Sequence, residues 1–308
     1  MTADWIADKT VLITGGNAGI GRATARALAA RGAHVTIGCR NSDRAEAARD
    51  DIAAATGVAI DVLPLDLGSL ASVRGAVAAF TRRQRSLDVL VNNAGVAALG
   101  RRRITHDGFE TQFGVNHLGH FLFTSLLLDH VEARVVNVAS AAYGLARDGL
   151  RWHDLQWEQD YDGWHAYGAS KLCNLYFTWE LADRCADRGV TVNALHPGFV
   201  DTELGRRRPE EATTPRSLGA SNGQSRDAAT RATERTTSVD LSALDAPLTP
   251  EDGARTTIML AADESVAGVT GAYYDEHQRR VEDLGPIAGD RDASARLWRI
   301  SEELVAAA

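Results

Sequence analysis

The alternation of short, β-branched apolar runs with longer, alanine-rich segments of helical period constrains this chain more than any other feature. The apolar runs predict strands at 10–14, 34–39, 59–66, 87–92, 133–139, 190–195 and 271–275. The segments between them predict helices at 20–31, 42–55, 69–85, 106–131, 165–188 and 250–262. Strands that alternate with helices build an α/β fold with a parallel sheet. We therefore expect a doubly wound, seven-stranded sheet with helices on both faces and a ligand crevice at the carboxyl ends of the strands.

Composition places the chain among globular domains. With 308 residues, 44% of them hydrophobic and 24% charged, it can bury a core as a single domain over 1–308 without disulfides or metals. The net charge of −8 argues against a nucleic-acid partner. Cys39, Cys173 and Cys185 are widely spaced, which indicates reduced packing residues rather than a disulfide or metal framework. Neither a basic leader nor a membrane span is visible, so we expect a cytoplasmic protein.

One segment, residues 205–246, interrupts the pattern. It contains no aromatic residue and few large aliphatic ones, so it can bury little surface. It follows the predicted strand at 190–195, on the edge of the sheet where we expect the ligand crevice. Two interpretations stay open: a mobile lid over the substrate, or an inert surface insertion.

A glycine-rich turn follows the first predicted strand and leads into the first helix. Its sequence is TGGNAGIG, residues 14–21. Glycines let the backbone approach a pyrophosphate closely, and the helix N-terminus offers unpaired N–H groups with a partial positive charge. Strand, turn and helix stand in the order of a Rossmann-type dinucleotide site. The candidate cofactor contacts in this turn are Gly15, Asn17, Gly19, Ile20 and Gly21.

The end of the second predicted strand bears on which dinucleotide binds. Enzymes that prefer NAD usually carry an acid there, which binds the ribose 2′-hydroxyl. This chain has Cys39, Arg40 and Asn41 instead, and an arginine can pair with a 2′-phosphate. We therefore expect NADP(H) to be preferred over NAD(H), with Arg40 and Asn41 among the contacts. The alternative is that Arg40 is an ordinary surface arginine.

A tyrosine and a lysine stand four residues apart, at Tyr167 and Lys171, in the helix predicted over 165–188. This spacing places the phenol and the ammonium on one helix face. The only other lysine is Lys9, so lysine is retained here against a strong bias toward arginine. A nearby ammonium, together with the positive nicotinamide ring of an oxidised cofactor, would lower the pKa of a phenol from about 10 and let it transfer protons.

In their order, these motifs resemble those of the short-chain dehydrogenases/reductases, nearly from end to end. The resemblance also rests on Leu65-Asp66-Leu67, Asn92-Asn93-Ala94-Gly95, Ser140 and Asn193-Ala194-Leu195-His196-Pro197-Gly198. Four stretches are similar to the branch of the retinol dehydrogenases and the WW-domain oxidoreductase: GCRN at 38–41, FGVNHLGHFLFT at 113–124, SKLCNLYFTWEL at 170–181 and ARLWRISEELV at 295–305.

The resemblance implies a catalytic group. Ser140 would hydrogen-bond the substrate oxygen, and Tyr167 would transfer the proton. Lys171 would lower the pKa of the tyrosine and hold the nicotinamide ribose, and Asn116 would hold a water that continues a proton relay. The alternatives are a strand-end cap for Ser140 and a bond to its own helix backbone for Asn116. The further cofactor contacts that the resemblance implies are Asp66, Leu67, Asn93, Ala94, Gly95, Tyr167, Lys171, Pro197, Gly198, Val200 and Thr202.

These features predict an NADP-dependent oxidoreductase that moves a hydride between the nicotinamide and an alcohol or carbonyl. Trp152, Trp157 and Trp164 precede Tyr167 and suggest a bulky apolar ketone or aldehyde as substrate, although packing anchors explain them equally well. Two other functions stay open: a non-catalytic NADP-sensing protein, and a reductase of C=C bonds on the same scaffold.

The remaining signals are weaker. His117 and His120 share a helix face, but no third ligand accompanies them, so we expect no metal site. The resemblance implies pairing through the helices after the fourth and fifth strands, and hence a homodimer or homotetramer. The C-terminal stretch 276–308 could alter that pairing.

Overall fold

The computed structural model describes residues 4–84, 86–201 and 246–308. Within them, seven parallel strands form one sheet in the order β3-β2-β1-β4-β5-β6-β7. This confirms the doubly wound α/β fold. Thr202 and, apart from Ala246, the segment 205–246 lie outside the described residues. The strands are β1 (Thr10–Thr14), β2 (His34–Cys39), β3 (Asp61–Pro64), β4 (Leu87–Asn92), β5 (Val131–Val138), β6 (Thr191–Leu195) and β7 (Tyr273–Tyr274).

The central strands β1, β2 and β4 have the bounds that their apolar runs predicted. They are almost wholly buried, and strands covered on both faces read as continuous runs of β-branched and aliphatic residues. Leu12 of β1 lies between Thr36 of β2 and Leu90 of β4. At the edges of the sheet, β3 and β7 are shorter than predicted, because fewer of their residues pair with a neighbour.

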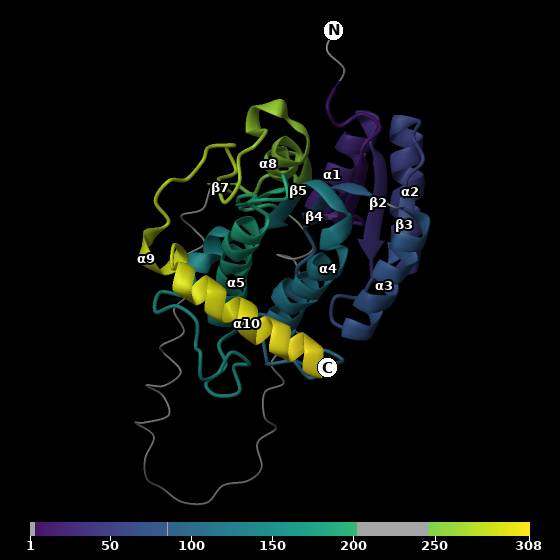
Figure 1. Cartoon of the computed structure of the whole chain (residues 1–308). Helices are drawn as coiled ribbons and strands as arrows, with labels where there is room; N and C mark the ends of the chain where they lie inside the picture. The colour runs from purple at the N-terminus through teal and green to yellow at the C-terminus, as the bar shows by residue number, and fades with distance from the viewer. Residues whose placement is uncertain (1–3, 85, 202–245) are drawn as a thin grey trace, which may run out of the picture.

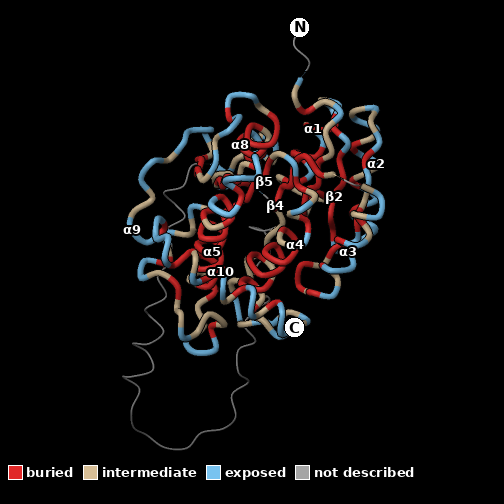
Figure 2. The backbone as a smooth tube through the Cα atoms, viewed as in Figure 1, coloured by how far each residue is buried: buried red, intermediate tan, exposed pale blue. Residues whose placement is uncertain are grey.

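Helices cover both faces of the sheet (Figure 1). On one face, α1, α2 and α8 pack around a cluster that includes Ile13 and Ile52. On the other, α3, α4 and α5 pack around a larger cluster that includes Leu90 and Phe123. Figure 2 shows the buried positions along the strands and on the inward sides of these helices. The bounds are α1 (Gly19–Ala30), α2 (Ser42–Thr56), α3 (Leu70–Arg83), α4 (His120–Leu127), α5 (Gly163–Arg184) and α8 (Pro250–Ala262).

Side-chain caps fix where most of these helices begin. Asn41, Ser69, Asp162 and Thr249 each accept a hydrogen bond from a backbone N–H in the first turn of α2, α3, α5 and α8. Such caps satisfy N–H groups that a helix leaves unpaired. No side chain caps α1 at Ala18, and its first turn holds no acid.

The segment predicted as one helix over 106–131 is divided, so this prediction is wrong in detail. A turn at Gly108, whose φ is +84°, delays the helix until residue 111. The chain then forms a π-helix, η1 (Phe113–Gly119), followed by α4 and a 3₁₀ turn, η2 (Leu128–His130). Apolar periodicity does not distinguish an α-turn from a π-turn, which accommodates one extra residue. Such π-turns occur frequently at functional sites.

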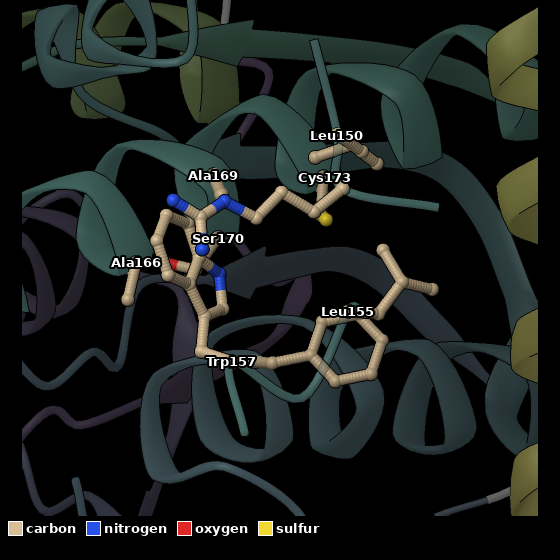
Figure 3. Close-up of a pocket in the computed structure, with 9 residues that line it drawn as sticks. Leu150, Leu155, Trp157, Ala166, Ala169, Ser170 and Cys173 are labelled. Atoms are coloured by element: carbon tan, nitrogen blue, oxygen red, sulfur yellow. The ribbon is translucent and has the colours of Figure 1, made fainter. Parts of the chain in front are cut away.

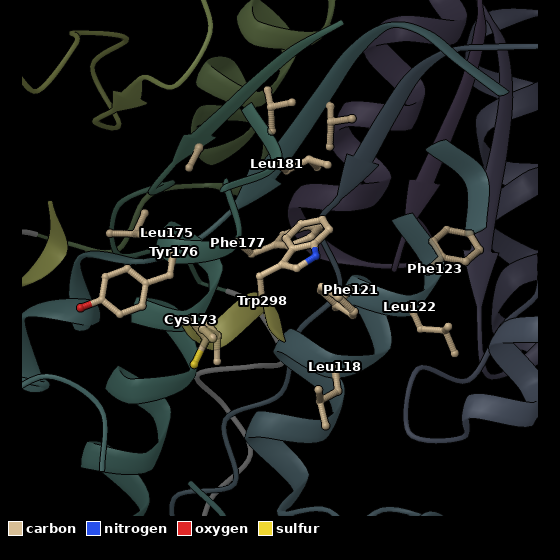
Figure 4. Packing of buried hydrophobic residues seen from close by; sticks show 14 of the residues in the cluster. Leu118, Phe121, Leu122, Phe123, Cys173, Leu175, Tyr176, Phe177, Leu181 and Trp298 are labelled. Atoms are coloured by element: carbon tan, nitrogen blue, oxygen red, sulfur yellow. The ribbon is translucent and has the colours of Figure 1, made fainter. Parts of the chain in front are cut away.

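Two helices near the C-terminus, α9 (Gly285–Ala288) and α10 (Arg291–Ala307), were not predicted. α10 runs across α5 and α4 (Figure 1). Its Trp298 stacks on Phe177 of α5, with ring centroids 5.9 Å apart, and meets Phe121 of α4 edge-on at 4.9 Å. Figure 4 shows these three side chains together in the cluster. α10 therefore covers the outer side of both helices.

Candidate active site

The predicted functional residues follow the carboxyl ends of the central strands. The glycine turn 15–21 follows β1, Arg40 follows β2, Asn93 follows β4, and Ser140 lies just beyond β5. β1 and β4 are neighbours in the sheet, although β2 and β3 separate them in sequence. Ligands of doubly wound sheets bind at such a switch point, outside the carboxyl ends of the strands.

Two positions of the turn require glycine. Gly15 has a φ of +70° and donates its N–H to the Gly38 carbonyl, 2.7 Å away. A Cβ at Gly21 would lie 2.4 Å from the Gly15 carbonyl oxygen and 2.5 Å from the Asn93 side-chain nitrogen. The turn therefore lies tightly against the end of β1 and against Asn93.

The N-terminus of α1 is open to an anion. Five other α-helices in the described part of the chain begin with a capping side chain, but α1 has neither such a cap nor an acid in its first turn. The backbone N–H groups of its first turn, which begins at Gly19 and Ile20 and lies next to Asn17, can therefore donate to phosphate oxygens. These residues fit the pyrophosphate of a dinucleotide.

The end of β2 carries no carboxylate. Burial raises the pKa of the Cys39 thiol to about 11, against hydrogen bonds from two backbone N–H groups of the glycine turn. Arg40 is exposed. Asn41 accepts a hydrogen bond from the Arg44 N–H at 2.8 Å, so its side chain caps α2. A cap explains Asn41 without a ligand, and its contact with a cofactor stays a prediction.

Thr14 anchors the segment after β4, residues 93–95, which forms one wall of the site. Its Oγ1 accepts hydrogen bonds from the N–H groups of Asn93 and Ala94, both at 2.9 Å. Asn93 Nδ2 donates in return to the Thr14 carbonyl at 2.8 Å. A Cβ at Gly95 would lie 3.6 Å from Lys171 Nζ. This wall therefore connects the glycine turn to the catalytic group.

The other predicted cofactor contacts follow β3 and β6. Asp66 follows β3, and its Oδ1 accepts a hydrogen bond from the Gly68 N–H at 2.9 Å; Leu67 beside it is buried. After β6, Gly198 has a φ of +79° and Val200 pairs with Leu248. The loop 196–200, which includes Pro197, is thereby fixed at the carboxyl edge. Binding by these residues stays a prediction.

Ser140, Tyr167 and Lys171 converge beyond the end of β5. The Ser140 side chain lies close enough to the Tyr167 phenol to lower the pKa of that phenol by hydrogen bonding. It also accepts a hydrogen bond from the Ala142 N–H at 3.2 Å, so the predicted capping role is present as well. Lys171 lies one turn along α5, with Nζ 5.7 Å from the centre of the Tyr167 ring and 3.2 Å from the Val138 carbonyl oxygen, to which it donates.

Burial determines the protonation of this group. It raises the pKa of Tyr167 to about 12, and the hydrogen bond from Ser140 opposes it only in part. Burial also lowers the pKa of Lys171 to about 8. In the protein alone, burial therefore outweighs the lowering of the phenol pKa that the Tyr167–Lys171 spacing predicts. At neutral pH the phenol keeps its proton and is poised to donate it.

Asn116 lies in the π-helix η1 and is fully buried. Its Nδ2 donates to the Val96 carbonyl at 3.0 Å and to Ser170 Oγ at 2.9 Å, and its Oδ1 accepts from the Val96 N–H at 2.8 Å. Its backbone carbonyl lies 3.1 Å from His120 Nδ1, and it also accepts from Asn174 at 2.8 Å in the amide orientation that satisfies Asn174. Asn116 thus joins the loop after β4 to α5. A water relay through it stays a prediction.

Trp152 and Trp157 are packing anchors. Trp157 is buried, and the Arg151 guanidinium lies 3.9 Å from its ring centre. The guanidinium of Arg296, on α10, lies 4.3 Å from the centre of the Trp152 ring. Figure 3 shows a narrow, mostly apolar pocket beside α5. Its lining consists of Phe113, Leu150, Arg151, Leu155, Trp157, Ala166, Ala169, Ser170 and Cys173.

His117 and His120 do not converge on a common point. His117 Nε2 lies 2.8 Å from Ser301 Oγ of α10, whereas His120 Nε2 lies 2.9 Å from Thr14 Oγ1. In the ranges 4–84, 86–201 and 246–308, no group of three or more histidine, cysteine, aspartate or glutamate residues could hold a metal ion. Across the same ranges, no helix has the length and apolar character needed to cross a bilayer.

The sequence motifs give no indication of the partners of Thr14, His120 and Asn174. Thr14 belongs to the glycine-rich motif, but the motif gives it no role, and nothing beside His120 in the sequence identifies its partner. One signal could have pointed to His120: a polar side chain in the otherwise apolar stretch 118–123 needs a hydrogen-bond partner when it is buried.

The site combines an uncapped helix N-terminus, which can bind a pyrophosphate, with a protonated phenol and an ammonium. These groups are typical of an oxidoreductase that uses NAD(P) and acts on CH–OH groups. Comparison with known proteins leads to the same class. The chain belongs to the short chain dehydrogenase family, whose model matches residues 9–151 and 155–213.

Several curated relatives of the chain are retinol dehydrogenases. The chain is 40% identical over 322 residues to retinol dehydrogenase 14 of Mus musculus, a match that covers 96% of this chain and 86% of the relative. It is 39% identical over 308 residues to retinol dehydrogenase 13 of Homo sapiens, covering 97% of this chain and 85% of the relative. The resemblance to the retinol dehydrogenase branch is therefore confirmed.

Solved structures share the fold. An uncharacterised protein from Mycobacterium paratuberculosis is 33% identical, with a TM-score of 0.72 and coverage of 99% of this chain and 96% of that chain. A short chain dehydrogenase from Burkholderia cenocepacia, in complex with NADP, is 25% identical, with a TM-score of 0.63 and coverage of 88% and 97%.

Proposed function

We propose that this oxidoreductase uses NADPH to reduce a bulky apolar aldehyde or ketone to the alcohol. The observation that carries the proposal is the convergence of Ser140, Tyr167 and Lys171 beside the glycine turn, with the phenol in its protonated form. A phenol whose pKa lies near 12 is an acid at neutral pH, which suits the proton donor of a reduction.

The protein's part in the reaction follows from the positions of these groups. Ser140 donates a hydrogen bond to the carbonyl oxygen and stabilises the negative charge that develops on it. Tyr167 gives its proton to that oxygen, and the Lys171 ammonium stabilises the phenolate that remains. The nicotinamide, when bound, supplies the hydride to the carbonyl carbon. One proton and one hydride together convert the carbonyl to an alcohol.

The preference for NADPH rests on Arg40. It is exposed directly beyond β2, and no acid occurs at residues 39–41 to bind an unphosphorylated ribose. An arginine–phosphate contact is charge-assisted, and its loss corresponds to about a tenfold to hundredfold change in affinity. The Burkholderia cenocepacia relative has NADP bound, which supports the same choice.

The substrate class is supported by the relatives. They are named for retinol, a large apolar alcohol, and the match spans nearly all of this chain. Trp152 packs against Arg296 of α10, and Trp157 packs against Arg151 and lines the narrow pocket beside α5, so neither ring by itself identifies the substrate. The proposal of an apolar carbonyl therefore rests on the relatives.

One kinetic experiment tests both the preference for NADPH and the substrate class. The purified chain is assayed by NADPH and NADH oxidation with retinal, long-chain aldehydes, cyclic ketones and acetaldehyde. We expect kcat/KM to be highest for the large apolar carbonyls with NADPH, and Tyr167→Phe to abolish turnover. Arg40→Ala should lower the preference for NADPH over NADH by about tenfold or more.

Three outcomes would contradict the proposal. Equal turnover by wild type and Tyr167→Phe would remove the proton donor. Reduction of isolated C=C bonds with no reduction of any carbonyl would favour the ring-reductase alternative. Tight NADPH binding without any turnover would favour the sensing alternative.

A further inference from the structure

His120 is a buried polar residue that the catalytic scheme does not use. It is the first residue of α4, directly after the π-helix, and only 3% of its surface is exposed. Its two ring nitrogens reach in different directions. Nε2 lies 2.9 Å from Thr14 Oγ1, at the start of the glycine turn. Nδ1 lies 3.1 Å from the carbonyl oxygen of Asn116.

The hydrogen bonds around His120 fix the position of each proton. The Asn116 carbonyl can only accept, so Nδ1 carries the hydrogen and donates it. Thr14 Oγ1 already accepts from the N–H groups of Asn93 and Ala94, so its own proton is left to donate. Nε2 is the near acceptor for that proton, since the Val91 carbonyl oxygen lies at 3.5 Å. His120 is therefore a neutral imidazole with its hydrogen on Nδ1.

This gives one continuous chain of hydrogen bonds across the site. It starts at the backbone of Asn93 and Ala94, passes through Thr14 and His120, and ends at the Asn116 carbonyl. At the Asn93–Ala94 end of this chain, a Cβ placed at Gly15 would lie 3.0 Å from the Cα of Ala94, so the Asn93–Ala94 wall touches the glycine turn. On the far side, Asn116 donates to Ser170 Oγ on α5, the helix that carries Tyr167 and Lys171.

We propose that His120 is a positioning residue that sets the dinucleotide turn and the Asn93–Ala94 wall relative to the π-helix and α5. Its two nitrogens act on different parts of the site. The bond from Thr14 holds the wall that faces the cofactor, so it governs cofactor affinity. The bond to Asn116 holds the π-helix against α5, so it governs the chemical step. The inference rests on the dinucleotide site of the proposed function.

His117 provides a matched control on the same segment. It is equally buried, but its Nε2 lies 2.8 Å from Ser301 Oγ of α10. The Ser301 hydroxyl donates to the Leu297 carbonyl at 2.8 Å, so His117 donates to Ser301. Its ring packs with Phe113 and Phe121, at centroid distances of 5.4 and 6.0 Å. His117 therefore faces α10 rather than the site.

Four single variants separate the two bonds. His120→Phe removes both and keeps a ring of similar size, and His117→Phe is its control. His120→Gln can place an amide near the position of Nε2 and so keep an acceptor for Thr14. His120→Asn can place an amide near Nδ1 and so keep the donor to Asn116. For each, the Kd values of NADPH and NADH are measured by nucleotide fluorescence, kcat is measured with the best carbonyl, and thermal unfolding is followed by circular dichroism.

We expect His120→Phe to raise the cofactor Kd by about tenfold, the factor for one buried hydrogen bond, and to lower kcat. His117→Phe should change Kd by less than about twofold. The other two variants should split the effects. His120→Gln should keep a Kd near that of wild type with a lowered kcat, and His120→Asn should show the reverse.

Three results would overturn the proposal: an unchanged Kd in His120→Phe, an equal rise of Kd in His117→Phe, or the same pattern in His120→Gln and His120→Asn. If His120→Phe does not fold, the comparison of the Gln and Asn variants decides. Cofactor binding needs no substrate, so a wild type that binds a nucleotide and reduces no carbonyl refutes the proposed function alone. A wild type that prefers NADH refutes only the role of Arg40.

Discussion

Lowering the pH from 7 to 5 should destabilise this protein through His117. The side chain is fully buried against Phe113, Phe121 and Phe177, and burial lowers its pKa from 6.5 to about 3. In the unfolded chain the imidazole gains a proton below pH 6.5, whereas in the folded protein it stays neutral until about pH 3. The unfolded state therefore binds more protons between these values, and stability falls as the pH falls.

The magnitude follows from the two pKa values. Each pH unit below 6.5 costs about 1.4 kcal/mol for one such group. Between pH 7 and pH 5, His117 should therefore lower the free energy of unfolding by about 2 kcal/mol. Because the folded-state pKa lies well below 5, the loss at pH 5 depends almost wholly on the unfolded-state value. His120, whose pKa burial lowers to about 4, should add a similar amount.

Urea unfolding at pH 7, 6 and 5, followed by far-ultraviolet circular dichroism, measures this loss. His117→Gln is the matched variant, because its amide nitrogen can still donate to Ser301 and does not titrate. We expect the variant to lose about 2 kcal/mol less than wild type between pH 7 and pH 5. An identical pH dependence in the two proteins would show that His117 is not held neutral by burial, and the argument from its aromatic surroundings would fail.

Three further predictions concern the site and its support. Trp298→Ala should lower the free energy of unfolding by about 3–5 kcal/mol in urea titrations, because a large ring packed against α4 and α5 is lost; a loss below 1 kcal/mol would mean that α10 packs loosely. Gly21→Ala should abolish nucleotide binding in a fluorescence titration, since its Cβ would lie 2.4 Å from the Gly15 carbonyl; an unchanged Kd would contradict the tight turn. The rate of carbonyl reduction should fall as the pH rises through about 8, where Lys171 loses its proton, and this step should vanish in Lys171→Met; a flat wild-type profile up to pH 9 would count against that role.

The sequence predicted the bounds of the central strands, but it overstated the edge strand β7 and missed the helix α10. β1, β2 and β4 are covered on both faces, so most of their residues are apolar, and the runs matched the strand bounds. The edge strand β7 is buried but pairs with β6 only through Tyr273 and Tyr274, so its apolar run overstated its length. α10 has a polar outer side and follows the short helix α9 rather than a strand, so it lies outside the strand–helix alternation.

The order of apolar runs and helical segments by itself determined the fold, because a parallel sheet with short connections leaves few ways to bury them. The glycine turn and the Tyr167–Lys171 spacing likewise fixed the class of chemistry, since both are local patterns of a few residues. The tertiary structure alone decided the protonation of the site and the partner of His120. Burial sets the pKa of Tyr167, and burial depends on residues far away in the chain. Thr14 and His120 are bonded although 106 positions separate them, and no local pattern encodes such a contact.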